Sequence, residues 1–177
     1  MTSVAEVATE IAPEAAGDPE LAARLADVAQ RTCMLARALV DAEQAALKLD
    51  LDGDGLDAHK FFSLSARYAR WRDFRVDPRG VGLHGIRLEP GEVVRLTQAE
   101  VEGHPDWSGF GQAAAHHPPL RGWLATPVCG ADLRDYGLLQ LSDKSGGADF
   151  TVQDEHRIRE LAAFAGATLD ALRTARR

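Results

Sequence analysis

The order of hydrophobic repeats along the chain limits its fold more than any other feature, because a helical repeat at each end encloses short alternating segments. In the first repeat, side chains suited to burial follow at steps of four and three residues, the spacing of one helix face: Leu21, Leu25, Val28, Thr32, Leu35 and Leu39. The last repeat spaces a second set in a similar way: Ile158, Leu161, Ala165, Leu169 and Leu172. Thr151 and Asp154 form a variant of the capping box and predict where the final helix begins. A fold for this chain must therefore bury one face of each of two terminal helices.

The residues between the two helical repeats predict short strands. Residues 46–51 and 61–64 lie on either side of a Gly- and Asp-rich turn, which indicates a hairpin. Three more strand segments follow, at 92–97, 121–128 and 136–143. The order helix, two strands, irregular middle, three strands, helix is typical of an α+β domain with antiparallel pairing.

The middle of the chain, residues 65–118, is rich in Arg, Gly, Pro and His. Apart from the strand segment at 92–97, it predicts one short helix after Thr97, which is expected to cap it. Irregular regions of this length in a compact domain are often functional. We therefore look for site residues in and after this region.

Length and charge limit the domain count and the partners. A chain of 177 residues suits one domain. Residues 1–19 lack a sustained apolar face, so we expect a flexible N-terminal tail over 1–19 and one folded domain over 20–177. The net charge is −7 and no Lys- or Arg-rich run stands out, which argues against nucleic acid and anionic membranes as partners.

The N-terminus and the cysteines indicate a cytoplasmic protein. Glu6 and Glu10 stand where a signal peptide would have a basic start and an apolar centre, and no apolar run approaches the length needed to span a membrane. Cys33 and Cys129 are far apart and lack the spacings of a zinc site or a disulfide framework. A reducing compartment suits both.

The last third of the sequence resembles the C-terminal half of a GAF domain. A strand ends in the step Pro127-Val128, the stretch "GLLQLSDK" follows, and "FTVQDE" opens the final helix. Upstream, "VVRLTQAEVEGHPDWSGFG" is similar to the middle of GAF domains in bacterial sensor kinases and phosphatases. The resemblance covers residues 20–174 and implies the GAF fold: a central antiparallel sheet, terminal helices on one face and a ligand pocket on the other.

A second motif allows two interpretations. Asp143, Lys144, Phe150, Asp154 and Glu155 resemble the N-K…F-x-x-x-D-E signature of GAF domains that bind cyclic nucleotides, with Asp143 in place of the Asn. The motif would then belong to a nucleotide site. The alternative, which we favour, is that Lys144 pairs with Asp154 to tie a strand to the last helix, while Phe150 packs beneath.

The stretch "HHPPLR" bears a narrower resemblance, to the GAF domains of dormancy-type sensor histidine kinases that bind haem b. In those domains the axial ligand is the His directly before P-P-M-R, a position that matches His117. A distal polar residue in the later strand, Tyr in the oxygen sensors, matches Gln140. The resemblance thus implies haem b with His117 as the iron ligand and a response to a diatomic gas or to redox state. Independently, the residue before Pro118 is confined to extended backbone, and neighbouring side chains then point to opposite sides, so only one of His116 and His117 can face a cavity.

The remaining candidates would form the walls of that cavity. Strand alternation predicts Tyr136, Leu138 and Gln140 on the ligand face, with Gly137, Leu139 and Leu141 packed on the helices. Trp123 and Phe110, together with Trp107, are candidate apolar walls, and Arg121 and Arg87 are candidate partners for haem propionates. The amide of a buried Gln140 can donate to an iron-bound ligand.

Three functions remain open. The first is a haem-based sensor of a diatomic gas or of redox state. The second is a haem-free regulatory or dimerisation module with a small organic ligand. The third is a haem-dependent enzyme of unknown substrate. The sequence shows no kinase, phosphatase or DNA-binding segment, so a sensor or a regulatory module would need a separate output protein. The two amphipathic terminal helices predict a homodimer.

Overall fold

A computed structural model describes residues 18–50, 59–72, 83, 86–107, 109–110 and 117–175. Its elements alternate as the hydrophobic repeats predict, with a helix at each end and five strands between. Two short 3-10 helices, labelled η1 and η4, complete the order: α1 Pro19–Val40, β1 Ala42–Leu49, β2 His59–Leu64, η1 Ala66–Trp71, β3 Val94–Leu96, α2 Gln98–Gly103, β4 Trp123–Cys129, β5 Asp135–Lys144, η4 Ser145–Gly147 and α3 Val152–Thr174. The predicted hairpin strands and the cap of α2 by Thr97 are confirmed. The predicted hairpin turn and the predicted tail, except its last two residues, lie outside the described residues.

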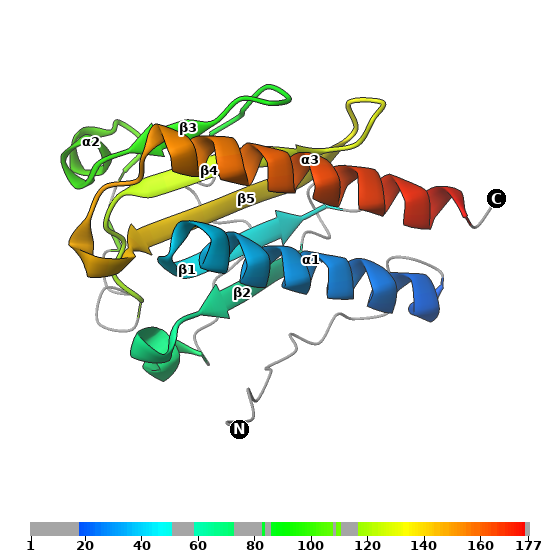
Figure 1. Cartoon of the computed structure of the whole chain (residues 1–177), viewed down its shortest axis with the longest axis horizontal. Helices are drawn as coiled ribbons and strands as arrows, with labels where there is room; N and C mark the ends of the chain where they lie inside the picture. The colour runs from blue at the N-terminus through cyan, green and yellow to red at the C-terminus, as the bar shows by residue number, and fades with distance from the viewer. Residues whose placement is uncertain are drawn as a thin grey trace.

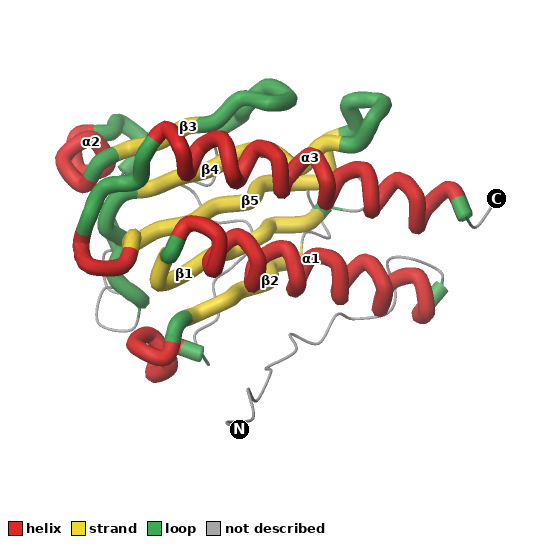
Figure 2. The backbone as a smooth tube through the Cα atoms, in the orientation of Figure 1, coloured by secondary structure: helices red, strands yellow, loops and turns green. Residues whose placement is uncertain are grey.

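The strands form one antiparallel sheet in the order β2-β1-β5-β4-β3. Helices α1 and α3 lie side by side across one face of this sheet (Figure 1). Figure 2 shows α1 and α3 as one layer and the strands as a second layer behind them. The expected α+β architecture is confirmed, and a second, smaller core lies on the opposite face of the sheet.

The main hydrophobic core lies between the sheet and the two helices. Alternate residues of the central strands point into it, including Leu47 of β1 and Leu139 of β5, and both are fully buried. Each such leucine contributes roughly 1.5–3 kcal/mol by leaving water. Ile158 and Leu169 of α3 meet them from the helix layer, as the final repeat predicts.

The predicted buried face of α1 is partly wrong. Leu35 and Leu39 are 50% and 46% exposed, whereas the buried side of the helix carries mostly smaller residues: Ala22, Leu25, Ala29, Thr32, Cys33, Ala36 and Val40. Small side chains let a helix backbone come close to its neighbours, and α1 contacts α3, β1 and β2 together. The close approach of α1 to its neighbours, and not the size of its side chains, therefore decides which face of α1 is buried.

The join between β5 and α3 supports the second interpretation of the Lys144 motif. Lys144 Nζ donates to Asp154 Oδ2 at 2.9 Å and to the Val40 carbonyl at 2.8 Å. Asp154 also accepts from the Thr151 backbone at 2.8 Å, while Thr151 Oγ1 accepts from the Asp154 backbone at 3.2 Å. Phe150 is buried in the core beside them. The motif thus ties the end of β5 to the start of α3 and the end of α1.

Tyr136 lies on the opposite face of the sheet from the one expected. It packs in the core under the helices, and its hydroxyl donates to Asp170 Oδ1 of α3 at 2.6 Å. Gly137 has a φ of 138°, and the pairing of β4 with β5 shifts between Val128 and Cys129. An irregularity of this kind turns the side chains that follow it to the other face of the sheet. The predicted alternation of β5 is therefore wrong before Gly137, at Tyr136, and holds after it.

Candidate functional site

A partly open cavity, here called the main pocket, lies on the sheet face opposite α1 and α3. Its lining includes Gln44, Lys60, Phe62, His117, Trp123 and Gln140, and its volume is about 70 Å³. The strand register explains the grouping: Ala46 of β1 pairs with Phe62 on one side and with Gln140 on the other. Because paired residues share a face of the sheet, side chains from β1, β2, β4 and β5 meet at one place.

Gln140 and Trp123 form the buried floor of the main pocket. Trp123 Nε1–H donates to Gln140 Oε1 at 3.1 Å, and both side chains are buried. Tryptophan and glutamine in such a position need hydrogen-bond partners, which explains why they occur together on adjacent strands. The bond also fixes the amide of Gln140 with its oxygen toward Trp123, so the donating NH₂ group is turned the other way.

His117 is half-buried at the edge of the main pocket. Its Nδ1 lies 2.6 Å from the carbonyl oxygen of Pro118. A carbonyl can only accept, so Nδ1 carries the proton and, in the neutral ring, Nε2 carries the lone pair. The imidazole stacks on Phe110 with ring centroids 3.6 Å apart and planes 19° from parallel.

The environment of His117 favours its neutral form. Burial is the largest influence and lowers the pKa of His117; the hydrogen bond to the Pro118 carbonyl opposes it, and the smaller effects of Lys60 and Asp143 lower and raise the pKa respectively. The unperturbed pKa of histidine is 6.5, so this side chain is neutral at pH 7. Its ring can therefore accept a hydrogen bond or ligate a metal through Nε2.

The structure brings most of the expected site residues together. His117, Gln140 and Trp123 line the main pocket, and Phe110 supports it from outside by stacking on His117. Arg121, expected beside haem propionates, lines a different cavity. Trp107 packs with Trp123 in a second core. His116 lies outside the described residues.

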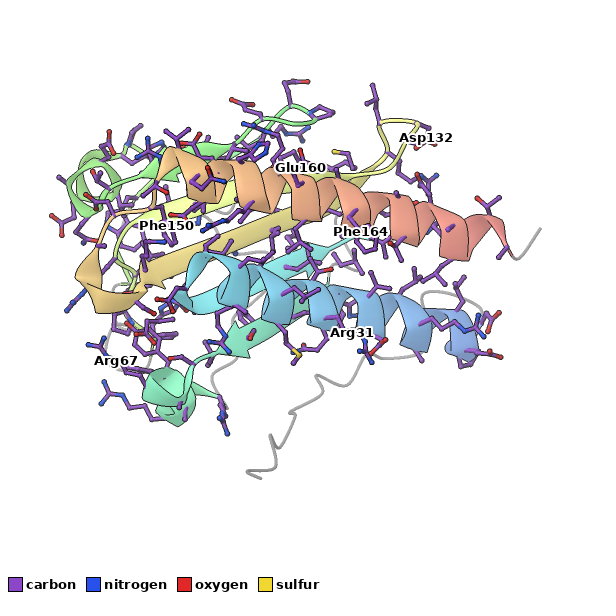
Figure 3. All side chains as sticks on the ribbon, in the orientation of Figure 1. Arg31, Arg67, Asp132, Phe150, Glu160 and Phe164 are labelled. Atoms are coloured by element: carbon purple, nitrogen blue, oxygen red, sulfur yellow. The ribbon has the colours of Figure 1, made fainter. Side chains whose placement is uncertain are left out.

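That different cavity, here called the polar pocket, lies where β1 begins and β5 ends. It has a volume of about 320 Å³, and its lining includes Glu43, Arg67, Tyr68, Arg121, Asp143 and Lys144. Figure 3 shows Arg67, a residue of η1, at this end of the molecule. Burial raises the pKa of Asp143, against hydrogen bonds from Gln44, Tyr68 and Ser142 that lower it.

Gln44 connects the two pockets. It lines the main pocket, while its Nε2 donates to Asp143 Oδ2 at 3.0 Å and to the Pro119 carbonyl at 2.6 Å. Tyr68 donates its hydroxyl to the other carboxylate oxygen of Asp143 at 3.0 Å. A change at the main pocket can therefore reach Asp143 through one side chain.

The side chains of the main pocket that the sequence analysis missed include Gln44, Lys60, Trp71 and Arg72. The alternation of β1 was a usable signal for Gln44, because Ala45, Leu47 and Leu49 form one apolar face and Gln44 must then lie on the other. Lys60, Trp71 and Arg72 had no such signal, because the register of β2 against β1 depends on the turn that joins them.

Within the described ranges, no group of three or more His, Cys, Asp or Glu side chains is placed to hold a metal ion. Cys33 and Cys129 are both free thiols, and burial raises the pKa of each.

Among the described residues, no helix combines the length and the apolar character that crossing a membrane requires.

No protein-family model matches the sequence, but solved structures match its fold. The GAF domain of PixJ from Thermosynechococcus elongatus, in its blue-light absorbing form, aligns with a TM-score of 0.68 at 16% identity, over 91% of this chain and 94% of that chain. The second GAF domain of DevS from Mycobacterium smegmatis aligns with a TM-score of 0.59 at 16% identity, over 86% of this chain and 97% of that chain. With its sheet order, its paired terminal helices and these matches, the chain has the fold of GAF domains.

Proposed function

We propose that this chain is a sensory domain that binds a small molecule in the main pocket and transmits the ligand's presence to its terminal helices. The observation that carries the proposal is the position of the main pocket, on the sheet face that α1 and α3 leave open, with polar groups of His117 and Gln140 converging on it. Apolar and aromatic walls with a few placed polar groups are the usual form of a small-molecule site.

Contacts at the end of the sheet support a route for the signal. Gln44 joins the main pocket to Asp143, and the next residue, Lys144, bonds to Val40 at the end of α1 and to Asp154 at the start of α3. A ligand that moves Gln44 would therefore act on both helices at once. The helices would pass the change to a second copy of the chain and to a separate output protein.

A pocket-filling variant tests this function. Ala46 lies between Phe62 and Gln140 on the floor of the main pocket, so Ala46→Phe would block it. In a thermal-shift screen of small organic molecules, we expect compounds that raise the Tm of the native protein but not that of Ala46→Phe. Ala163→Phe, at an exposed position on α3, is the control and should respond like the native protein. A screen in which every active compound also stabilises Ala46→Phe would contradict the proposal.

Haem b is a second candidate ligand, because His117 has the chemistry of an axial ligand. A neutral ring whose Nδ1 donates to a backbone carbonyl is the usual state of a metal-bound histidine. The volume opposes haem: the described residues enclose about 70 Å³, whereas sites for drug-sized ligands measure roughly 300–1,000 Å³. The described residues fit the iron ligand but not the porphyrin ring. Bound haem would supply an iron that responds to a diatomic gas or to redox state.

Absorption spectra separate the two candidates. The protein is purified with adequate haem supply, and spectra are recorded with and without dithionite and carbon monoxide. The small volume of the main pocket leads us to expect no Soret band. A Soret band that is lost in His117→Ala and kept in His116→Ala would overturn this expectation and establish haem as the ligand.

A further inference from the structure

We infer that Gln44 and Asp143 are positioning residues of the main pocket, because they hold the residues that place His117 beside it. These residues, 117–121, are here called the His117 segment. The inference rests on the proposed function, since it assigns both side chains to a ligand site. It goes beyond the signal route, because it makes the geometry of that site depend on Asp143, which lines the polar pocket.

The His117 segment precedes the sheet and contains two residues that cannot donate a backbone hydrogen bond. β4 begins only at Trp123, and Pro118 and Pro119 have no N–H group. His117 and Pro118 nevertheless line the main pocket, and Pro118 is buried. Because buried backbone polar groups need partners, the carbonyl and N–H groups that remain in the segment decide how it is held.

Gln44 holds the His117 segment through the carbonyl of Pro119. Its Nε2 donates to that carbonyl at 2.6 Å and to Asp143 Oδ2 at 3.0 Å. A side-chain amide has two N–H groups, so both are in use, and a flipped amide would place its oxygen against two acceptors. Pro119 and Asp143 together therefore fix the orientation of Gln44.

Asp143 holds the other end of the His117 segment directly. Its backbone N–H donates to the Arg121 carbonyl at 3.0 Å, and its carboxylate accepts from the backbone N–H of Arg121 and from the hydroxyl of Tyr68. Asp143 is only 4% exposed, so these bonds are shielded from water. The segment is thus fastened at residues 119 and 121 to the start of β1 and the end of β5.

The backbone of Asp143 supports a role at the site. Its φ is 59°, in the left-handed region that residues other than glycine rarely occupy. Such a conformation persists where the surroundings fix it, and it is common at ligand sites. Asparagine and glycine adopt this conformation more readily than other residues, so they can replace Asp143 without adding backbone strain.

The place of His117 can be measured without a ligand, through its ring. Nδ1–H donates to the Pro118 carbonyl at 2.6 Å, and the ring stacks on Phe110. Both contacts require the observed conformation of the His117 segment. The nitrogen chemical shifts of the ring report which nitrogen carries the proton, and the shifts of its carbon-bound protons report the stacked aromatic ring.

The test compares Gln44→Met, Asp143→Gly and Asp143→Asn with the native full chain by nuclear magnetic resonance, at about pH 8, where a histidine ring is neutral. His117→Ala assigns the signals of the ring. Gln30→Met is the matched control, because Gln30 Nε2 also donates to a backbone carbonyl, that of Phe62 at 3.0 Å, but from the helix side of β2. Circular dichroism checks that each variant is folded.

We expect the native protein to show His117 with its proton on Nδ1 and with ring protons shifted upfield by Phe110. In Gln44→Met and Asp143→Gly this form should no longer predominate, and most of the upfield shift should be lost. Asp143→Asn should keep both signals, since its carbonyl can accept from Gln44 while its NH₂ group donates to the hydroxyl of Tyr68. Gln30→Met should keep both signals as well.

A second measurement connects the His117 segment to binding. The probe is a compound that raises the Tm of the native protein but not that of Ala46→Phe. Its affinity should fall about tenfold in Asp143→Gly and stay unchanged in Asp143→Asn and Gln30→Met. Asp143 is not among the described residues that line the main pocket, so this loss would report the displaced segment and not a missing contact.

Two outcomes would overturn the inference while leaving the proposed function intact. One is a His117 ring that keeps its proton on Nδ1 and its stacking in both Gln44→Met and Asp143→Gly. The other is a ring that moves while the affinity for the probe stays the same. If no compound separated the native protein from Ala46→Phe, the proposed function would fall, and the assignment of Gln44 and Asp143 to a ligand site would fall with it.

Discussion

The hydroxyl of Tyr136 joins the sheet to the last helix through one short hydrogen bond. It donates to Asp170 at 2.6 Å, while the same carboxylate accepts from the backbone of Ala131 at 2.6 Å. Burial and this bond raise the pKa of Tyr136 to about 12. A hydrogen bond to a charged acceptor contributes more to stability than one between neutral groups.

Tyr136→Phe removes that bond and keeps the ring. We expect it to lower the free energy of unfolding by about 1–2 kcal/mol, measured by urea denaturation. Asp170→Asn in the Tyr136→Phe background should cost less than Asp170→Asn alone, because the two groups share one interaction. Additive effects of the two substitutions would contradict this account.

A second prediction concerns pH and Asp154. Burial alone would raise the pKa of Asp154, but hydrogen bonds from Lys144 and Thr151 outweigh it, so the pKa lies below the ordinary 3.8. A carboxyl whose pKa is lower in the folded state stabilises that state above its ordinary pKa and loses this effect as pH falls through the folded value. Asp154→Asn should therefore destabilise the protein by about 1–2 kcal/mol at pH 7.

The difference in stability between native protein and Asp154→Asn should shrink as pH falls below about 4, as measured by urea denaturation across pH. Comparison with Asp154→Asn is necessary because Asp143 has a raised pKa. The contribution of Asp143 to stability therefore changes with pH in the opposite direction. A difference that stays constant from pH 7 to pH 2.5 would show that Asp154 does not act through its charge.

The pocket residues differ in how far the sequence predicted them. Strand alternation after Gly137 directs Gln140 to the pocket face, so that residue followed from a local rule. Local rules allowed only one of His116 and His117 to face a cavity, and the resemblance to haem-binding GAF domains selected His117. Arg121 was expected in the same pocket as His117, but it precedes β4 at the other end of the site and lines the polar pocket. Lys60 was missed because its direction depends on the pairing of β2 with β1, which no local rule supplies.

The order of helices and strands was predictable because each element has its own hydrophobic period and its own caps. Thr97 and Thr151 both begin helices with reciprocal capping bonds, as their spacing to Glu100 and Asp154 indicates. The buried face of α1 was not predictable in the same way. It depends on how closely α1 approaches α3 and the sheet, and apolar residues occur on both of its sides.

The contact of α3 with β4 leads to a prediction about Gly166. A Cβ added there would lie 1.9 Å from the carbonyl oxygen of Cys129, too close without movement of the helix. Gly166→Ala should lower the free energy of unfolding by about 1–3 kcal/mol, despite the better helix propensity of alanine. Gly103→Ala at the end of α2 is the control, because nothing lies within 4 Å of its added Cβ. Equal stabilities of the two variants would contradict the close packing of α3.

The outer side of the helix layer leads us to propose a homodimer. Leu35 and Leu39 of α1 are about half exposed, and Phe164 of α3 is 70% exposed; Figure 3 shows Phe164 on the side of α3 that faces the viewer. Exposed apolar patches on soluble proteins commonly mark interaction sites. The dimer would bring the signal route from both main pockets to one interface.

Leu39→Glu combined with Phe164→Glu should give a folded monomer, as measured by light scattering at high micromolar concentration. Leu133→Glu, an equally exposed site in the loop between β4 and β5, should leave the dimer intact. A native protein that is monomeric at the same concentration would exclude this mode of association.

The central claim, that the main pocket binds a small molecule, is tested most directly by nuclear magnetic resonance of the ¹⁵N-labelled protein during titration with a compound that raises the Tm of the native protein but not that of Ala46→Phe. The indole N–H of Trp123 and the side-chain amides of Gln140 and Gln44 report on the main pocket. Gln98 reports on the polar pocket and Gln30 on the helix side of β2. The account predicts saturable shifts that are largest at Trp123 and Gln140 and smaller at Gln98 and Gln30. Unchanged signals of Trp123 and Gln140 at high compound concentration would contradict it.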